Sequence, residues 1–285
     1  MLHDSLCHFD LSDPVDATKA ENYRKHEKPF VGFNLPEQDR VVEKWGDIEY
    51  LREKIGPQTF RTETSTDNHF MYWNGGGGKK KDKNWKPPTS NVWVTFDDWL
   101  SLAVNMQNKS LEERKHQYFR VTAESSKPRA KNKWVFDELE FFQPKKQLYI
   151  VDPQYQQGIH CRFGMRSIIA EAHFDRSRNS IAMMRGLRRW VLAPLSECST
   201  MYILPKNHPS GRHSEVDWSQ PDLESFPEFP KTNVHEVILQ PGDILYIPTS
   251  YIHYIVSLNV NIQCNTRSGT QDTPDDKVNL KKCGF

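Results

Sequence analysis

Short apolar runs fill the second half of the chain, and they constrain its fold more than any other feature. From Leu148 onward, Gly, Pro and Asn separate these runs at close intervals. They read LYIVD, GIHCRFG, RSIIAEAHFD, NSIAMM, RWVLAP, MYILP, HEVILQPGDILYIP, YIHYIVSL and VNIQCN. Closely spaced short strands of this kind indicate a β-barrel or a double-sheet core. We therefore predict a mainly β core.

The first half carries the helical signals. VVEKWGDIEYLREKIG (41–56) has apolar residues at helical spacing and ends at Gly56-Pro57, whereas VTFDDWLSLAVNM (94–106) is amphipathic and begins at Thr95 or Asp97 as cap. The apolar positions of the first segment are Trp45, Ile48, Leu51 and Ile55. We expect N-terminal and flanking helices to cover the β core within one continuous domain.

Composition divides the chain into three parts. Residues 1–27 are polar and predict an N-terminal arm, residues 28–270 predict the folded domain, and residues 271–285 predict a C-terminal tail. Inside the domain, NGGGGKKKDKNWKPP (74–88) cannot bury enough apolar area to order itself. It predicts a flexible loop whose lysines are solvated, with a polyanion contact as the less favoured alternative.

Charge and hydropathy limit the location and the partners. The 38 Lys and Arg residues nearly balance 37 Asp and Glu residues, so the formal charge of +1 gives no global field toward nucleic acid or an anionic membrane. The sequence has no apolar run long enough to span a bilayer and no secretory signal at its start. We expect an intracellular protein, cytoplasmic or nuclear, with no membrane partner.

The five cysteines are scattered, odd in number and free of any CxxC pair. This pattern argues against a disulfide framework and against a thiolate zinc site, and it favours a reducing compartment.

A possible metal site begins in AEAHFD (170–175). Side chains alternate across a strand, so His173 and Asp175 project onto one face. A third candidate ligand, His253, follows about eighty residues later, after the turn Pro241-Gly242-Asp243 and a short strand. Two imidazoles and one carboxylate form the facial triad that holds Fe(II) and leaves coordination positions open. The alternative is an ordinary pair of buried, hydrogen-bonded histidines.

The run from about residue 28 to residue 267 resembles the JmjC (Jumonji-C) cupins, which are Fe(II)/2-oxoglutarate oxygenases with a double-stranded β-helix (jelly-roll) core. KPFVGF, VEKWGDIEYLREKIG, NHPSGRHSEVDWSQPDLESFPEF (207–229) and PGDILYIP are similar to the small JmjC hydroxylases that act on hypoxia-inducible factor or on wybutosine in tRNA. The resemblance implies that His173, Asp175 and His253 are both the iron ligands and the catalytic residues.

The resemblance also implies the cosubstrate contacts. A basic residue on the strand after the HxD strand meets the far carboxylate of 2-oxoglutarate, and Arg188 holds the matching position. Alternation in RRWVLA lets one of its two arginines point inward. Tyr118, Asn179 and Asn265 match further polar contacts of the cosubstrate.

The implied reaction is decarboxylation of 2-oxoglutarate to succinate, coupled to hydroxylation of a C–H bond, most simply on a protein or peptide side chain. Ala170 replaces a frequent hydroxyl, and Arg267 places a charge near the pocket mouth. These departures and Arg188 leave open a noncatalytic cupin that serves as an interaction or assembly subunit. An RNA hydroxylase is the weaker third possibility. We expect a monomer, because the sequence ends soon after the barrel.

Overall fold

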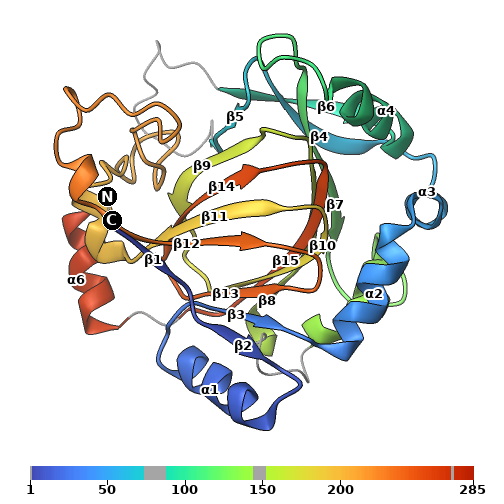
Figure 1. The fold of residues 1–285 in the computed structure, drawn as a ribbon, viewed down its shortest axis with the longest axis horizontal. Helices are drawn as coiled ribbons and strands as arrows, with labels where there is room; N and C mark the ends of the chain where they lie inside the picture. The colour runs from blue at the N-terminus through green and yellow to red at the C-terminus, as the bar shows by residue number, and fades with distance from the viewer. Residues whose placement is uncertain (1, 74–87, 144–151, 271–272) are drawn as a thin grey trace.

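A computed structural model describes residues 2–73, 88–143, 152–270 and 273–285. Its strands form two sheets that roll around a common interior (Figure 1). In spatial order, the six-stranded sheet holds β1 (Leu2–Ser5), β12 (Asn233–Leu239), β11 (Arg188–Ala193), β14 (Ile252–Ser257), β9 (Ile169–Phe174) and β5 (His69–Phe70). The nine-stranded sheet holds β2 (His8–Asp10), β3 (Phe30–Phe33), β13 (Ile244–Ile247), β10 (Asn179–Arg185), β15 (Asn261–Ser268), β8 (Gln156–Gly164), β7 (His116–Ala123), β4 (Phe60–Ser65) and β6 (Thr89–Val94).

The strands from β8 to β15 make the jelly-roll core. The chain alternates between the sheets except at β11 and β12, which both lie in the smaller one; β8, β10, β13 and β15 lie in the larger sheet, and β9 and β14 complete the smaller group. All neighbours within these two groups pair antiparallel. The predicted mainly β fold with a double-stranded β-helix is confirmed.

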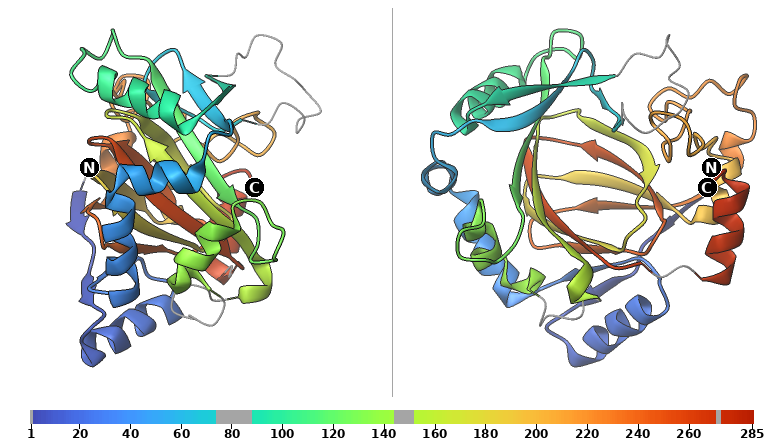
Figure 2. Two further views of the ribbon diagram at one scale, coloured as in Figure 1. Left: turned by 90° about the vertical axis from the view of Figure 1, so that its right-hand side faces the viewer. Right: turned by 180° about the vertical axis from the view of Figure 1, so that it is seen from behind.

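Helices cover the outer face of the larger sheet (Figure 2). The helices of the described residues are α1 (Pro14–Lys25), α2 (Pro36–Gly46), α3 (Ile48–Ile55), α4 (Phe96–Met106), α5 (Lys133–Glu138) and α6 (Pro274–Lys282), with short 3₁₀ turns at Glu140–Phe142, Pro153–Tyr155, Leu195–Ser199 and Phe229–Lys231. None of these helices is long and apolar enough to cross a membrane. The single helix predicted over 41–56 is two helices, because Asp47 ends α2 and caps α3 by accepting from the Glu49 amide at 2.9 Å.

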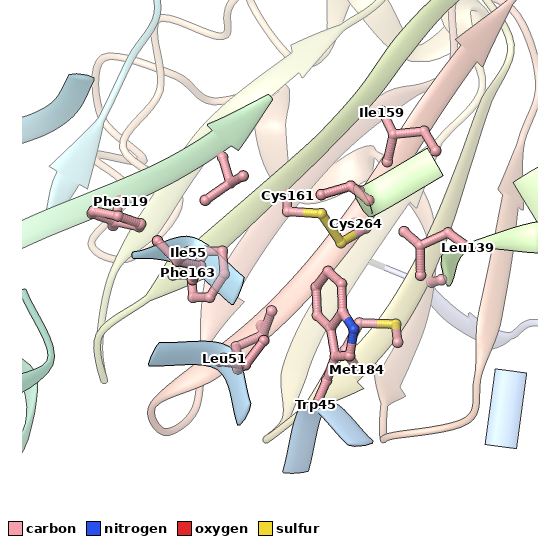
Figure 3. Packing of buried hydrophobic residues seen from close by; sticks show 14 of the residues in the cluster. Trp45, Leu51, Ile55, Phe119, Leu139, Ile159, Cys161, Phe163, Met184 and Cys264 are labelled. Carbon is pink, nitrogen blue, oxygen red and sulfur yellow. A yellow bond between two sulfur atoms is a disulfide. The ribbon is translucent and has the colours of Figure 1, made fainter. Parts of the chain in front are cut away.

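The helices bury the outward face of the larger sheet. Trp45, Leu51 and Ile55 from α2 and α3 are fully buried in the same cluster as Phe119 and Phe163 (Figure 3). Strand alternation turns the intervening residues of β7 and β8 into the barrel, so the apolar positions face the helices and the polar ones face the interior. A polar site can therefore form inside the barrel without interrupting the core.

The ends of the chain are also folded. β1 pairs in parallel with β12, β2 pairs in parallel with β3, and α1 follows directly. Hence much of the predicted polar arm (1–27) extends the two sheets, and part of the predicted tail (271–285) is helix α6, which contacts the 3₁₀ turn Leu195–Ser199. The division into domains stays a prediction, and the predicted loop at 74–88 lies almost entirely outside the described residues.

The cysteines overturn one expectation. Cys161 pairs with Cys264, and Cys198 pairs with Cys283, whereas Cys7 is free (Figure 3 shows the first pair). The prediction of no disulfides is wrong because the barrel sets Cys161 of β8 directly opposite Cys264 of β15, although 103 residues separate them. The spacing of the cysteines along the sequence does not reveal the register of β8 with β15.

We expect the unfolded, unreduced protein to expose one reactive thiol and the reduced protein five. Replacing Cys161 and Cys264 together by Ala should lower the free energy of unfolding by about 2–5 kcal/mol, since the cross-link restricts a long loop of the unfolded chain. Thiol titration and denaturant unfolding check both statements. Cys7→Ser is the matched control and should leave stability unchanged; five reactive thiols without reductant would refute the pairing.

Candidate metal centre

Three side chains from distant parts of the chain meet inside the barrel. Candidate ligand atoms of His173, Asp175 and His253 all lie within 4.8 Å of one another. β9 carries His173, the residues just after β9 supply Asp175, and β14 carries His253 directly opposite His173 in the antiparallel register. The pairing of β9 with β14 thus brings together the residues that the sequence singled out.

A β-bulge sets which side chains of β9 point inward. His253 pairs with His173 and Ile255 pairs with Ala170, so β9 holds one more residue than β14 across this interval. As a result Ala170 and His173, three positions apart, both line the inner pocket, whereas Glu171 turns away to hydrogen-bond with His69. Simple alternation from His173 would have placed Glu171 inside.

Both histidines are fixed for coordination through one ring nitrogen. His173 Nδ1 lies 2.7 Å from the carbonyl oxygen of Glu171, and His253 Nδ1 lies 3.0 Å from that of Tyr251. A carbonyl oxygen only accepts, so Nδ1 carries the proton in each ring and donates it. The lone pair is therefore on Nε2, and this backbone support is typical of metal-binding histidines.

The charges of these groups suit a cation. Burial lowers the pKa of His173 well below its usual value and also lowers that of His253, so both rings are neutral at pH 7. Burial acts to raise the pKa of Asp175, but the positive charges of Arg267 and Arg212 outweigh it and lower the pKa to about 2. The result is two neutral imidazoles beside one ionised carboxylate.

Two arginines neutralise that carboxylate. Arg267 Nη2 lies 2.6 Å from Asp175 Oδ2, and Arg212 Nη1 lies 3.8 Å from Asp175 Oδ1. Arg267, which was expected near the pocket mouth, is therefore a direct ion-pair partner of the candidate metal ligand Asp175.

The other predicted residues lie around the triad. Tyr118, Asn179 and Asn265 line the inner pocket, whose volume is about 90 Å³, and Asn265 Nδ2 donates to Asn179 Oδ1 at 2.9 Å. Arg188 is not among the residues that line this pocket. Its Nη1 donates to the Tyr118 hydroxyl at 2.7 Å and its Nε donates to Asn261, so it contacts the pocket through Tyr118.

Arg188 is a fully buried cation, with 0% of its side chain exposed. Burial lowers its pKa, its Nη2 makes no hydrogen bond, and no carboxylate of the described residues lies within ion-pair distance. A Cβ at Gly164 would lie 2.6 Å from Nη2, so the glycine provides the space that this side chain occupies. A buried charge without a counterion is costly, and an anionic ligand would relieve that cost.

Sequence reasoning missed three neighbours of the triad. The ring of Trp190 lies 5.8 Å from that of His253, and the ring of His213 stacks on His173 at 4.9 Å. Arg162 lines the pocket and holds its guanidinium over the Tyr118 ring at 5.6 Å, on which Arg188 also packs at 5.2 Å. Strand alternation from Arg188 could have found Trp190, which lies two positions further along β11. His213 instead comes from residues 207–229, here called the insert, whose path the sequence does not specify.

A second group of ligand types lies nearby. His69, Glu171 and Asp217 also fall within 4.8 Å of one another. His69 already hydrogen-bonds with Glu171, and Asp217 accepts from the amide and hydroxyl of Ser219 at 2.8 and 2.7 Å. The hydrogen bond thus joins β5 to β9, and Asp217 adds a negative charge beside His69.

Sequence comparison agrees with this geometry. The family profile described as a cupin-like domain matches residues 16–266, which is most of the chain. The chain belongs to the cupin-like family of JmjC type. The predicted family is thereby confirmed, and the triad lies where the two sheets of this cupin enclose their interior.

Several curated proteins are similar to this cupin. tRNA wybutosine-synthesizing protein 5 of Danio rerio is 28% identical over 60% of this chain and 52% of its own length. JmjC domain-containing protein F of Dictyostelium discoideum is 32% identical over 38% of this chain and 26% of its own length. Lysine-specific demethylase 8 of Xenopus tropicalis is 29% identical over 36% and 23% respectively. The chain thus spans about half the length of these relatives or less.

The donor set of the cupin fits a divalent transition metal. Nitrogen ligands bind such ions at about 2.1 Å, so two adjacent ligands on one octahedral face are about 3.0 Å apart. The three ligand atoms lie within 4.8 Å of one another, and inward shifts of at most about 1 Å each would bring them to this spacing. Two imidazoles and a carboxylate on one face, with the remaining positions open, favour Fe(II).

Metal retention tests the assignment of ligands. His173→Ala should reduce Mn(II) or Fe(II) affinity by at least about 100-fold, because removing one of three ligands exceeds the 10- to 100-fold cost of losing a supporting contact. His213→Gln, which removes the stacked ring but no proposed ligand, is the matched control and should retain the metal. Calorimetric titration measures both; loss of binding in the control alone would mean that the wrong histidine has been chosen.

The half-buried His160 also predicts how stability depends on pH. Burial, followed by the charge of Arg162, lowers the pKa of His160 to about 4, whereas an unfolded chain titrates histidine near 6.5. Below pH 6.5 the unfolded chain binds a proton that the folded chain excludes, so this contribution to stability is lost as pH falls toward 4.

The metal-free His160→Gln variant should therefore lose stability less steeply than the parent between pH 6.5 and 4, by up to about 1.4 kcal/mol per pH unit. A hydrogen bond to Glu171 raises the pKa of His69, so His69 affects the pH dependence of stability in the opposite direction. The test is therefore the difference between the parent and the His160→Gln variant, because His69 is present in both. Thermal unfolding between pH 6.5 and 4 measures this difference. The same pH dependence of stability in both proteins would contradict a lowered pKa of His160.

Proposed function

We propose that this cupin is an Fe(II)- and 2-oxoglutarate-dependent oxygenase that hydroxylates a protein side chain. The observation that carries the proposal is the convergence of His173, Asp175 and His253 within 4.8 Å inside the barrel. Bound iron would supply oxygen activation coupled to decarboxylation of the cosubstrate to succinate. Membership of the JmjC-type cupins supports an oxygenase of this kind.

The protein's own groups would bind and orient the reactants. The two Nδ1–H···O=C contacts hold the imidazoles with Nε2 directed to the metal, and Arg267 and Arg212 position the carboxylate of Asp175. Asn179 and Asn265 offer amide groups to the cosubstrate at the pocket wall. The buried Trp190 and Ile181 help to exclude water from the inner pocket.

Arg188 would neutralise the far carboxylate of 2-oxoglutarate. It is the buried guanidinium without a carboxylate partner among the described residues, and it adjoins the pocket through Tyr118. The guanidinium of Arg162 also lies over the Tyr118 ring, and it adds positive charge to the same pocket. One carboxylate of a bound dicarboxylate would therefore lie near the cations beside Tyr118, and the other would lie near the triad.

Replacing Arg188 tests the cosubstrate site. Arg188→Met should raise the KM for 2-oxoglutarate by at least about 10-fold, because a charge-assisted hydrogen bond contributes about 1.5–3 kcal/mol, whereas Arg188→Lys should retain part of the affinity. The matched control is Arg189→Met, which removes the outward arginine that pairs with Glu236. Fe(II)-dependent succinate formation is the readout. If Arg162→Met loses activity while Arg188→Met keeps it, Arg162 is the carboxylate partner.

A noncatalytic cupin is the second candidate. The direct pairing of Arg267 with Asp175 and the small inner volume of about 90 Å³ favour it, because a cation already neutralises the carboxylate and little space lies beside the triad. Succinate formed in proportion to enzyme and iron decides for the oxygenase. Absence of succinate together with absence of metal binding decides for the noncatalytic cupin. The expected monomer stays a prediction, whereas the two disulfides count against the expected cytoplasmic or nuclear location.

A further inference from the structure

A basic groove leads from the surface to the candidate metal centre. An outer hollow of about 670 Å³ is lined by Arg176, Lys206, Arg212 and Lys277, and it contains no Asp or Glu among the described lining residues. A second hollow of about 490 Å³ shares Tyr72, Arg176 and Arg212 with the first and also reaches His173 and Asp175. The two hollows therefore form one path, which we name the basic groove.

The charge of the groove departs sharply from that of the whole chain. The second hollow adds Arg120, Arg162 and Arg267. Asp175 is the single carboxylate among its described lining residues. The complete chain has a formal charge of only +1. Cations have thus been gathered along the approach to the site, whereas the compensating acids lie elsewhere.

Strand register explains part of this concentration. Arg120 of β7 and Arg162 of β8 are direct cross-strand partners and point to the same face. Like charges placed opposite each other destabilise a sheet. Glu63 offsets Arg120 by an ion pair, and no carboxylate of the described residues pairs with Arg162, Lys206 or Lys277 within 4.0 Å. An anionic ligand would relieve this repulsion.

We propose, on the basis of the proposed oxygenase function, that the basic groove binds an acidic segment of a protein substrate. Carboxylates of Asp and Glu residues on one side of the target residue would pair with Lys206, Lys277 and Arg176 while the target enters the inner pocket. The groove extends from the triad toward α6 and the insert, so the acidic run lies on one side of the target only.

A nucleic acid would also suit a basic groove, and the exposed ring of Tyr72 could stack on a base. The disulfides decide between the two polymers. Cys161–Cys264 and Cys198–Cys283 favour an oxidising compartment, because thiols stay reduced in the cytosol and nucleus, where RNA is processed.

Peptide binding tests the groove directly. Fluorescein-labelled hexaglutamate is titrated with the 285-residue protein in the presence of Mn(II), and fluorescence anisotropy reports binding. The double variant Lys206→Ala/Lys277→Ala should weaken binding by about 2- to 30-fold, since exposed ion pairs contribute about 0.2–1 kcal/mol each. Binding that is unaltered in this variant would overturn the proposal.

The matched control removes two exposed lysines from the other side of the barrel. Lys44 is on α2 and Lys109 follows α4, and both views place these helices across the barrel from α6 (Figures 1 and 2). Lys44→Ala/Lys109→Ala should change hexaglutamate affinity by less than about twofold. An equal loss in both double variants would mean that net charge alone drives binding, and would overturn the proposal.

A labelled single-stranded RNA of twelve nucleotides is tested alongside. Tighter binding of RNA than of hexaglutamate, with a steeper dependence on salt, would replace the acidic peptide by a nucleic acid. Succinate formation by the unaltered protein is measured in parallel. Its absence, with hexaglutamate bound through Lys206 and Lys277, would overturn the oxygenase proposal and leave the basic groove standing.

Discussion

The antiparallel pairing of β9 with β14 is the contact on which the rest of this protein depends. It joins two segments separated by about eighty residues and sets His173 directly opposite His253. A register shift of one residue would turn one of these rings out of the barrel. The bulge between Ala170 and His173 then determines that Ala170 lines the pocket while Glu171 turns away to hydrogen-bond with His69 of β5. One strand pair thus fixes the candidate metal centre and the pocket wall.

The barrel interior is organised around positive charge. Arg188 is buried at one end, Arg162 and Arg188 share the ring of Tyr118, and Arg267 pairs with Asp175 at the other end. Uncompensated cations of this kind destabilise a folded protein unless anions approach them. The proposed cosubstrate and the proposed acidic substrate are both anions, so the same electrostatic feature connects the two proposals. Burial, by contrast, is what keeps the histidines of the interior neutral.

The exterior of the barrel supplies the stability that this interior lacks. Trp45, Leu51 and Ile55 pack on the outward residues of β7 and β8, and the Cys161–Cys264 disulfide joins β8 to β15 within the same cluster. Period-two alternation separates the two environments by a single layer of backbone. The polar interior can therefore hold ligands while the apolar exterior maintains the register of the strands.

The sequence by itself determined the local features of this protein. Short apolar runs predicted the strands, the cap at Thr95 predicted the start of α4, and alternation predicted that one arginine of RRWVLA points inward. The residue types and spacing of His173, Asp175 and His253 predicted a shared site, because strand periodicity and ligand chemistry are readable locally. The resemblance to JmjC cupins supplied the fold that joins them.

Only the tertiary structure decided the contacts between distant segments. The two disulfides, the pairing of Arg267 with Asp175, the stacking of His213 on His173 and the basic groove all join residues far apart in the chain. Each depends on strand register or on the path of an insert, and periodicity specifies neither. Which residues become neighbours across the barrel is fixed by the free energy of packing the whole core.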